Sequence, residues 1–340
     1  MSNSAVLLID CPDQKGLVAR VSGLLYEHGA NILHADQHQD HDLGLFFMRV
    51  EWALDGDGNC QSSNAAKGPV SGRGNESSRA PGSGRQAGGP VAPGVASPGE
   101  HEPSVPAAQT SSGFFDLDAF KAAFALMAAE LGMRWRLTSR TQQPRIALFC
   151  SQYLHCMADL LDRWHAGELA CEIPVIVSNH PAVEKLAGFH GIPFELIEVT
   201  PATKSEAEAR QLAVLAEQKI DLVVLARYMQ ILSSEFVARY PAGIINVHHS
   251  FLPAFTGARP YHAAHARGVK LIGATSHYVT ELLDDGPIID QDVARISHRD
   301  QVEDLVARGR DLERIVLSRA VRWHLDQRIL CYGNKTVVFD

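Results

Sequence analysis

The sequence lacks an excess of basic residues. Its 340 residues include 31 Lys and Arg against 39 Asp and Glu, which gives a formal net charge of −8. Proteins that bind nucleic acid or a membrane surface usually carry a basic patch, so this balance argues against both classes of partner. Apolar residues make up 46% of the chain and aromatic residues only 7%. Such a composition is typical of a soluble globular protein.

Paired cysteines and long apolar runs are also missing. The six cysteines contain no CxxC pair, which favours reduced thiols in the cytosol. No stretch approaches the roughly 18 apolar residues of a membrane-spanning helix. The N-terminus has no basic region before its short apolar run, so it does not resemble a signal peptide. We therefore expect a cytoplasmic protein.

Glycine and proline are concentrated in one segment. Residues 54–112 hold 11 of the 27 glycines and 7 of the 17 prolines, and no aromatic residue lies between Trp52 and Phe114. Such a segment buries too little apolar surface to offset its chain entropy. The composition predicts a disordered insertion at 54–112.

The two flanks of this insertion together complete one small domain, over residues 1–140. The expected elements are a strand at 5–9, a helix at 17–28, strands at 31–38 and 45–52, a helix at 117–131 and a strand at 133–138. A hairpin with one helix is marginally stable alone, so the last helix and strand are needed to complete the sheet. On the strand at 31–38 and just beyond it, polar residues alternate at His34, Asp36, His38 and Asp40. Since they lack a tetrahedral zinc spacing, we interpret them as a polar sheet face.

Two runs in this region resemble the ACT domain, a ferredoxin-like module with the order βαββαβ. They are Cys-Pro-Asp-x-x-Gly-Leu-Val-Ala at 11–19 and His-Gly-Ala-Asn-Ile at 28–32. By this resemblance Asp13, Gly16 and Asn31 lie where an amino-acid effector binds. The resemblance fits a purely structural, dimerising role equally well. It also implies a homo-oligomer, a dimer or a tetramer.

Residues 144–340 alternate between short apolar strands and helices. Strands are expected at 145–150, 173–178, 194–199, 221–226 and 243–247, with helices at 155–165, 182–190, 205–218 and 233–240. This pattern predicts a Rossmann-like α/β domain with a mostly parallel sheet. Ligands bind at the carboxyl ends of such strands, just past Leu225 and Val247. The first strand is followed by Cys150-Ser-Gln-Tyr-Leu-His155, which has no glycine and so argues against a phosphate cradle there.

An amide and an imidazole stand two residues apart at Asn246 and His248, so both project to one side of an extended chain. The amide can donate to an oxyanion and the imidazole can move a proton at neutral pH. Asp284 and Asp285 lie in a tight turn downstream, and either could orient the imidazole. By itself this spacing is a weak signal, since most such histidines are structural. A serine nucleophile at Ser250 lacks the GxSxG elbow.

Longer motifs resemble the folate-dependent formyl transfer enzymes. They include Ile-Asn-Val-His-His-Ser-Phe-Leu-Pro-Ala-Phe-Thr-Gly-Ala-Arg-Pro-Tyr-His at 245–262 and His-Tyr-Val-Thr-Glu-Leu-Leu-Asp-Asp-Gly-Pro-Ile-Ile at 277–289. Together with the ACT-like region, the chain resembles the formyltetrahydrofolate deformylase family over nearly its whole length except the insertion. The resemblance implies hydrolysis of 10-formyltetrahydrofolate to formate and tetrahydrofolate, without metal or redox cofactor.

The resemblance also assigns roles to individual residues. The catalytic residues would be Asn246, His248 and Asp284, with Asp284 orienting a water and His248 assisting protonation of the leaving amine. The folate pocket would be lined by Arg227, Tyr228, Met229, Gln230, Ile231, Val279, Thr280 and Leu283, with His249 at its edge. His262 is expected in the pocket wall and His265 on a helix surface.

The chain departs from this family at Leu154 and Leu282, where acidic residues are frequent, which bears on loop geometry rather than on the reaction. Two alternatives remain open. One is a formyltransferase that uses the same residues to pass the formyl group to an amine acceptor. The other is a non-catalytic amino-acid sensor built on the ACT-like region.

Overall fold

The computed structural model describes residues 3–54, 115–254 and 259–340. The insertion predicted at 54–112 lies outside these ranges except for Leu54. Within them, no helix combines the length and the apolar character needed to cross a bilayer.

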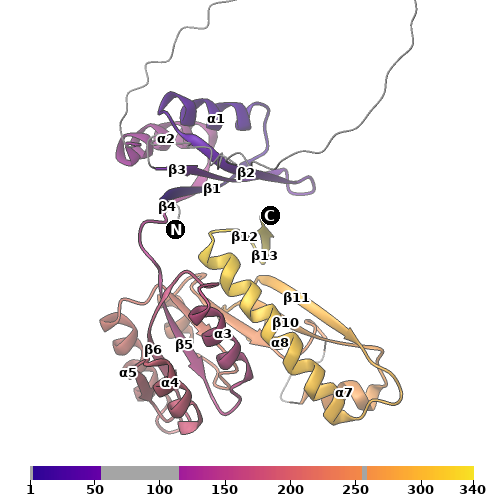
Figure 1. Ribbon diagram of the computed structural model, residues 1–340. Helices are drawn as coiled ribbons and strands as arrows, with labels where there is room; N and C mark the ends of the chain where they lie inside the picture. The colour runs from indigo at the N-terminus through magenta and orange to yellow at the C-terminus, as the bar shows by residue number, and fades with distance from the viewer. Residues whose placement is uncertain (1–2, 55–114, 255–258) are drawn as a thin grey trace, which may run out of the picture. The chain divides into compact units, whose positions relative to one another are not determined.

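The N-terminal elements form a four-stranded antiparallel sheet with the strand order β2-β3-β1-β4. Its elements are β1 (Ser4–Pro12), α1 (Leu17–Glu27), β2 (Asn31–Asp40), β3 (Leu45–Ala53), α2 (Leu117–Leu131) and β4 (Arg134–Ser139). The predicted order βαββαβ is confirmed, and α1 and α2 both cover one face of the sheet (Figure 1). Helix α2 has the predicted bounds because the Asp116 side chain accepts from the Ala119 N–H at its start and Gly132, at φ 63°, ends it.

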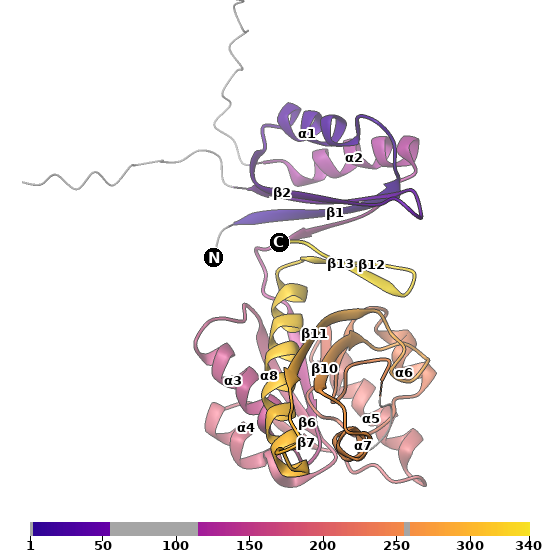
Figure 2. The same cartoon turned by 90° about the vertical axis from the view of Figure 1, so that its right-hand side faces the viewer.

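The other face of this sheet is covered by a C-terminal hairpin, β12 (Ile329–Tyr332) and β13 (Lys335–Val338) (Figure 2). The apolar cluster between them consists of Val6, Leu8, Phe47, Leu330, Val337 and Phe339. Coverage on both faces explains why β1 is buried along almost its whole length instead of alternating.

The larger sheet has seven strands in the order β11-β10-β9-β8-β5-β6-β7. Its elements are β5 (Arg145–Cys150), α3 (His155–His165), β6 (Glu172–Ser178), η1 (Pro181–Val183), α4 (Glu184–His190), β7 (Phe194–Leu196), α5 (Lys204–Glu217), β8 (Leu222–Leu225), α6 (Ser234–Arg239), β9 (Ile244–His248), α7 (Pro260–Arg267), β10 (Leu271–Tyr278), β11 (Ile288–Arg295) and α8 (Val302–Leu325). Strands β5 to β9 pair in parallel, as predicted, whereas β10 and β11 are antiparallel. The predicted α/β class is thus confirmed, and β10 has no counterpart among the expected strands.

Helices cover both faces of this larger sheet. One apolar core lies between the sheet and α3, α4 and α8, and a second lies between its opposite face and α5 and α6. The carboxyl ends of β8 and β9 therefore open at one edge between these two layers. Strand β10 runs antiparallel to β9, so it ends beside the start of β9. The chain that follows it, 279–284, nevertheless lies with the end of β9 around one cavity.

Candidate active site

A cavity of about 620 Å³ lies at this edge of the sheet. Three segments line it: the loop after β8, the end of β9, and the chain between β10 and β11. Of the residues that the sequence predicts for this site, all except His262 line the cavity: Asn246, His248, Asp284, Arg227, Tyr228, Met229, Gln230, Ile231, His249, Val279, Thr280 and Leu283.

His248 and Asp284 form a buried pair in this cavity. The Nδ1 atom of His248 lies 3.2 Å from Oδ2 of Asp284. Because a carboxylate oxygen only accepts, Nδ1 carries the proton and donates it to Asp284. This hydrogen bond lowers the pKa of Asp284 despite partial burial, which keeps the carboxylate ionised at neutral pH. The opposite ring atom, Nε2, is buried and has no hydrogen-bond partner among the described residues.

Asn246 pairs with a second histidine, His277, across β9 and β10. Its Nδ2 atom lies 3.2 Å from Nε2 of His277, whose Nδ1 lies 2.9 Å from the carbonyl oxygen of Tyr278. That carbonyl only accepts, so Nδ1 carries the proton and Nε2 is left as the acceptor for Asn246. Burial lowers the pKa of His277, which keeps the ring neutral. Asn246 is thereby held with its amide group fixed, and its second N–H remains available to a ligand.

The turn that carries Asp284 fits closely against the end of β10. Gly286 has no side chain, and a Cβ there would lie 1.7 Å from the carbonyl oxygen of Tyr278. Asp284 itself adopts a positive φ of 55°, a conformation that non-glycine residues rarely take. Asp285 is exposed, so only the first of the two aspartates in this turn faces the cavity.

His249 extends the cluster behind His248. Their rings stack with centroids 5.1 Å apart. Burial, with the nearby charge of Arg227, lowers the pKa of His249 to about 4, so this ring is uncharged at neutral pH. The cavity thus holds the Asp284 carboxylate among three histidines, two of which are held neutral.

Comparisons with known proteins show the family of this chain. Residues 144–321 match the formyl transferase family and residues 5–51 match the ACT domain. A formyltetrahydrofolate deformylase from Synechocystis is 46% identical to this chain. The match covers 99% of this chain and 98% of the Synechocystis protein. The chain belongs to the formyltetrahydrofolate deformylase family. The solved structure of a formyltetrahydrofolate deformylase from Pseudomonas syringae is 41% identical and superposes with a TM-score of 0.80, covering 100% of this chain and 95% of that one.

The larger domain of this deformylase family is also shared more widely. The structure of a glycinamide ribonucleotide transformylase from Symbiobacterium toebii is 28% identical to this chain and superposes with a TM-score of 0.56. The match covers 60% of this chain and 98% of the transformylase. Similarity to that protein is confined to part of the chain, whereas the deformylases match it from end to end.

The ACT-like region of this deformylase-family chain has a cavity of its own, of about 680 Å³. Asp13 and Gly16 line it together with the start of α1 and with residues 37–39 of β2. Asn31, the third residue expected at an effector site, is not among the residues that line this cavity. The alternating residues of β2 are largely exposed, as predicted for a polar face.

Two placements differ from the sequence-based expectations. His262 was expected in the pocket wall, but it is exposed on α7 and does not line the cavity at the sheet edge. Conversely, His277 had no predicted role, although it contacts Asn246 and lies 3.8 Å from Asp284. The signal that could have found it is strand pairing, because an antiparallel β10 places residue 277 opposite residue 246.

Proposed function

We propose that this protein hydrolyses 10-formyltetrahydrofolate to tetrahydrofolate and formate. The observation that carries the proposal is the ionised Asp284 bonded to Nδ1 of His248, beside an Asn246 amide that His277 holds in place. Family membership supplies the substrate class, and the geometry supplies a proton carrier and an oxyanion donor in one cavity.

The proposed reaction adds water to the formyl carbon. With its Nδ1–H donated to Asp284, the imidazole of His248 has a lone pair on Nε2 that accepts a proton from the attacking water. The resulting oxyanion accepts a hydrogen bond from the free N–H of Asn246. When the C–N bond breaks, the amine nitrogen takes the proton from Nε2. The formic acid that forms loses its remaining proton to solvent and leaves as formate.

Asp284 has two tasks in this scheme. Its carboxylate keeps His248 in the required tautomer and stabilises the imidazolium that forms, as the carboxylate does in a Ser-His-Asp triad. It also helps to orient the attacking water. The scheme uses side chains and water, so it requires neither a metal nor a redox cofactor.

The rest of the cavity suits the folate. Met229, Gln230 and Ile231 follow β8, and Val279 and Thr280 follow β10, so both segments present irregular backbone to the cavity. Exposed backbone N–H and C=O groups can pair with the polar edge of a pterin ring, while apolar side chains contact its faces. Leu282 and Leu283, both exposed and both lining the cavity, form its outer rim.

Transfer of the formyl group to an amine is the alternative that shares this chemistry. A phosphorylated acceptor needs a glycine-rich cradle after the first strand, and residues 150–155 contain no glycine. The test is formate release from 10-formyltetrahydrofolate with no amine present. We expect one formate for each tetrahydrofolate formed. Release that depends strictly on an added amine would overturn the hydrolase proposal.

For the ACT-like region we propose regulation by an amino acid. Asp13 offers a carboxylate to an ammonium group, and the start of α1 at Gly16 offers N–H groups to a carboxylate. Repeating the formate assay with glycine and methionine tests this, with Asp13→Ala as the variant expected to lose the response. If no amino acid alters the rate, the dimerising role remains. A purely sensory protein would instead bind an amino acid and release no formate.

A further inference from the structure

Beside the proposed active site lies a buried charge pair that the mechanism above does not use. Arg227 follows β8 at its carboxyl end and is 9% exposed, and Glu313 in α8 is 1% exposed. Nε of Arg227 lies 3.4 Å from Oε2 of Glu313. Burying two ions costs several kcal/mol each unless good geometry compensates, so this pair requires an explanation.

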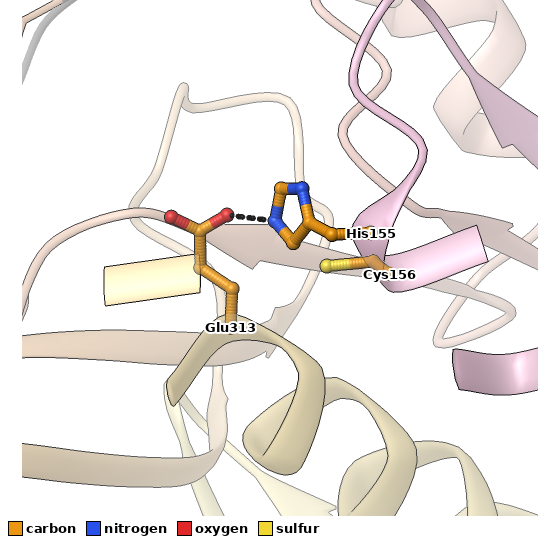
Figure 3. A group of neighbouring side chains, drawn as sticks. All are labelled: His155, Cys156 and Glu313. Carbon is orange, nitrogen blue, oxygen red and sulfur yellow. Dashed lines mark hydrogen bonds and ion pairs between the residues drawn. The ribbon is translucent and has the colours of Figure 1, made fainter. Parts of the chain in front are cut away.

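The carboxylate of the pair is fully engaged. Its Oε1 accepts from the hydroxyl of Tyr261 and its Oε2 lies next to Nε2 of His155, both at 2.7 Å (Figure 3). Gly309, one turn before Glu313, leaves room for Tyr261, because a Cβ there would lie 2.1 Å from the ring. Burial alone would raise the pKa of Glu313, but the hydrogen bond from His155, the charge of Arg227 and the hydrogen bond from Tyr261 lower it. Glu313 is therefore an anion.

The guanidinium of the pair is not satisfied in this way. Nε and Nη1 of Arg227 are buried, and within the described ranges neither has a hydrogen-bond acceptor. The ring of Tyr153 covers the guanidinium at 5.3 Å and supplies no acceptor in its plane. Buried donors without acceptors are rare and costly. A guanidinium fork is well matched to the two oxygens of a carboxylate.

A metal ion is the competing explanation for this region. Ligand atoms of His155, Cys156 and Glu313 lie within 4.8 Å of one another (Figure 3). However, the Arg227 cation already faces the carboxylate that such an ion would need. Burial raises the pKa of the Cys156 thiol well above its usual range, which keeps it protonated and a poor ligand. The surroundings therefore favour an anion beside Arg227 over a cation at Glu313.

Arg227 lies in the wall of the same cavity as His248 and Asn246. His249 connects the two, because its ring stacks on His248 and the nearby charge of Arg227 contributes to lowering its pKa. The formyl group of the substrate is neutral, and at the reacting carbon a carboxylate appears only when water has been added and the C–N bond has broken. A cation at this position therefore distinguishes product from substrate.

We propose that Arg227 binds the formate released by the reaction, and that Glu313 weakens this binding so that formate can leave. The inference rests on the proposed hydrolysis for the identity of the anion. Glu313 opposes the anion by its own negative charge. His155 and Tyr261 hold the Glu313 carboxylate in place, so that it does not swing across to satisfy Arg227 completely.

The test measures binding of ¹³C-formate to the purified full-length protein without folate, by NMR titration. We expect saturable binding. Arg227→Met should weaken it by about tenfold to a hundredfold, the value of hydrogen bonds to a charged group. Arg227→Lys, which keeps the charge without the fork, should weaken it less. Glu313→Gln keeps most hydrogen-bond acceptors but removes the repelling charge, so it should bind formate more tightly than the wild type.

Arg310→Met is the matched control. Arg310 stacks on the same Tyr153 ring at 5.9 Å but is exposed, so its loss should leave formate binding unchanged. Absence of saturable binding, wild-type affinity in Arg227→Met, or an equal loss in Arg310→Met would each overturn the inference. Weaker binding in a folded Glu313→Gln would overturn the assigned role of Glu313. If that variant does not fold, the three arginine variants still decide whether Arg227 binds formate.

The two proposals fail separately. If formate binds through Arg227 but the protein releases no formate without an amine, the anion site stands and the hydrolysis proposal is wrong. If the protein releases formate without an amine but the Arg227 variants bind formate like the wild type, the hydrolysis proposal stands and the anion site is wrong.

Discussion

Two sheets of this protein carry histidines, and the histidines differ in what surrounds them. On β2 of the smaller sheet, His34 and His38 are exposed beside other polar side chains. On β9 and β10 of the larger sheet, His248 and His277 are 5% and 2% exposed, and both lie near Asp284. The residue type is the same, but of these four histidines only the buried pair has a ring nitrogen within 4 Å of a carboxylate oxygen. Enclosure, more than the presence of imidazole, separates a candidate catalytic histidine from a solvated one.

The largest expected effect is loss of the imidazole that carries the proton. His248→Ala should lower kcat by about 10² to 10⁴, the usual contribution of a general acid or base. The matched control is His34→Ala, measured in the same formate assay, with circular dichroism to establish that both variants fold. Wild-type kcat in His248→Ala would remove this residue from the mechanism.

Removal of the oxyanion donor should have the next largest effect. Asn246→Ala is expected to lower kcat by about 10² to 10³ with little change in KM, since the hydrogen bond strengthens only as the oxyanion forms. Steady-state kinetics with 10-formyltetrahydrofolate measures the split. A rise in KM at constant kcat would show instead that Asn246 binds the ground state.

His277 should act through Asn246, so its removal should have a smaller effect. His277→Phe takes away the acceptor at Nε2 and should lower kcat by about tenfold, the value of one hydrogen bond of 1 to 1.5 kcal/mol. The double variant with Asn246→Ala should be no slower than Asn246→Ala alone. Multiplicative losses in the double variant would mean that His277 has an independent role.

His324 in α8 is a partly buried histidine that does not line the active-site cavity, so it allows the stability of the protein to be tested apart from its activity. Nδ1 of His324 lies 2.7 Å from the hydroxyl of Tyr278. Desolvation of the ring lowers the pKa of His324 to about 4. In the unfolded chain its pKa is near 6.5, so below that pH the unfolded state binds the proton first. The stability that neutral His324 contributes is therefore present above pH 6.5 and is lost as the pH falls towards 4.

This contribution can be measured by urea unfolding at pH 7 and pH 5. The wild type should lose free energy of unfolding between these values, by at most roughly 2 kcal/mol from this one group. His324→Gln should show a smaller loss over the same interval. An unchanged pH dependence in His324→Gln would mean that the ring is not buried as a neutral group.

The smallest effect is expected on β2. His34→Ala should change kcat less than twofold and the free energy of unfolding by no more than about 0.5 kcal/mol, since exposed substitutions rarely exceed this. The same two assays measure both quantities. A loss comparable to that of His277→Phe would contradict the contrast between the exposed and the enclosed histidines.

Much of the fold follows from local signals. Helices α2 and α3 have their predicted bounds, and the strands from β5 to β9 lie where apolar runs predict them. Strand β10 was not predicted, because its sequence, Leu-Ile-Gly-Ala-Thr-Ser-His-Tyr, contains polar residues although the strand is nearly all buried. Thr275 and Ser276 are tolerated there because the sheet and its neighbours surround them, and local sequence does not report such tertiary contacts.

The residues of the candidate site also differ in whether the sequence alone could predict them. Motifs along the chain were sufficient to name Asn246, His248 and Asp284, which the structure brings into one cavity. The role of His277 depends on the pairing of β9 with β10. The role of Glu313 depends on a contact with Arg227, from which it is separated by 86 positions in the sequence. His262 was misplaced because a motif position does not tell which face of α7 a side chain occupies.

The central claim is that the enclosed Asn246, His248 and Asp284 direct water, and not an amine, to the formyl carbon. Its most direct test is the reaction of 10-formyltetrahydrofolate in H₂¹⁸O without any amine, followed by mass spectrometry of the formate. We expect formate that carries one ¹⁸O atom, formed far more slowly by His248→Ala. Formate that appears only after an amine is supplied would contradict it.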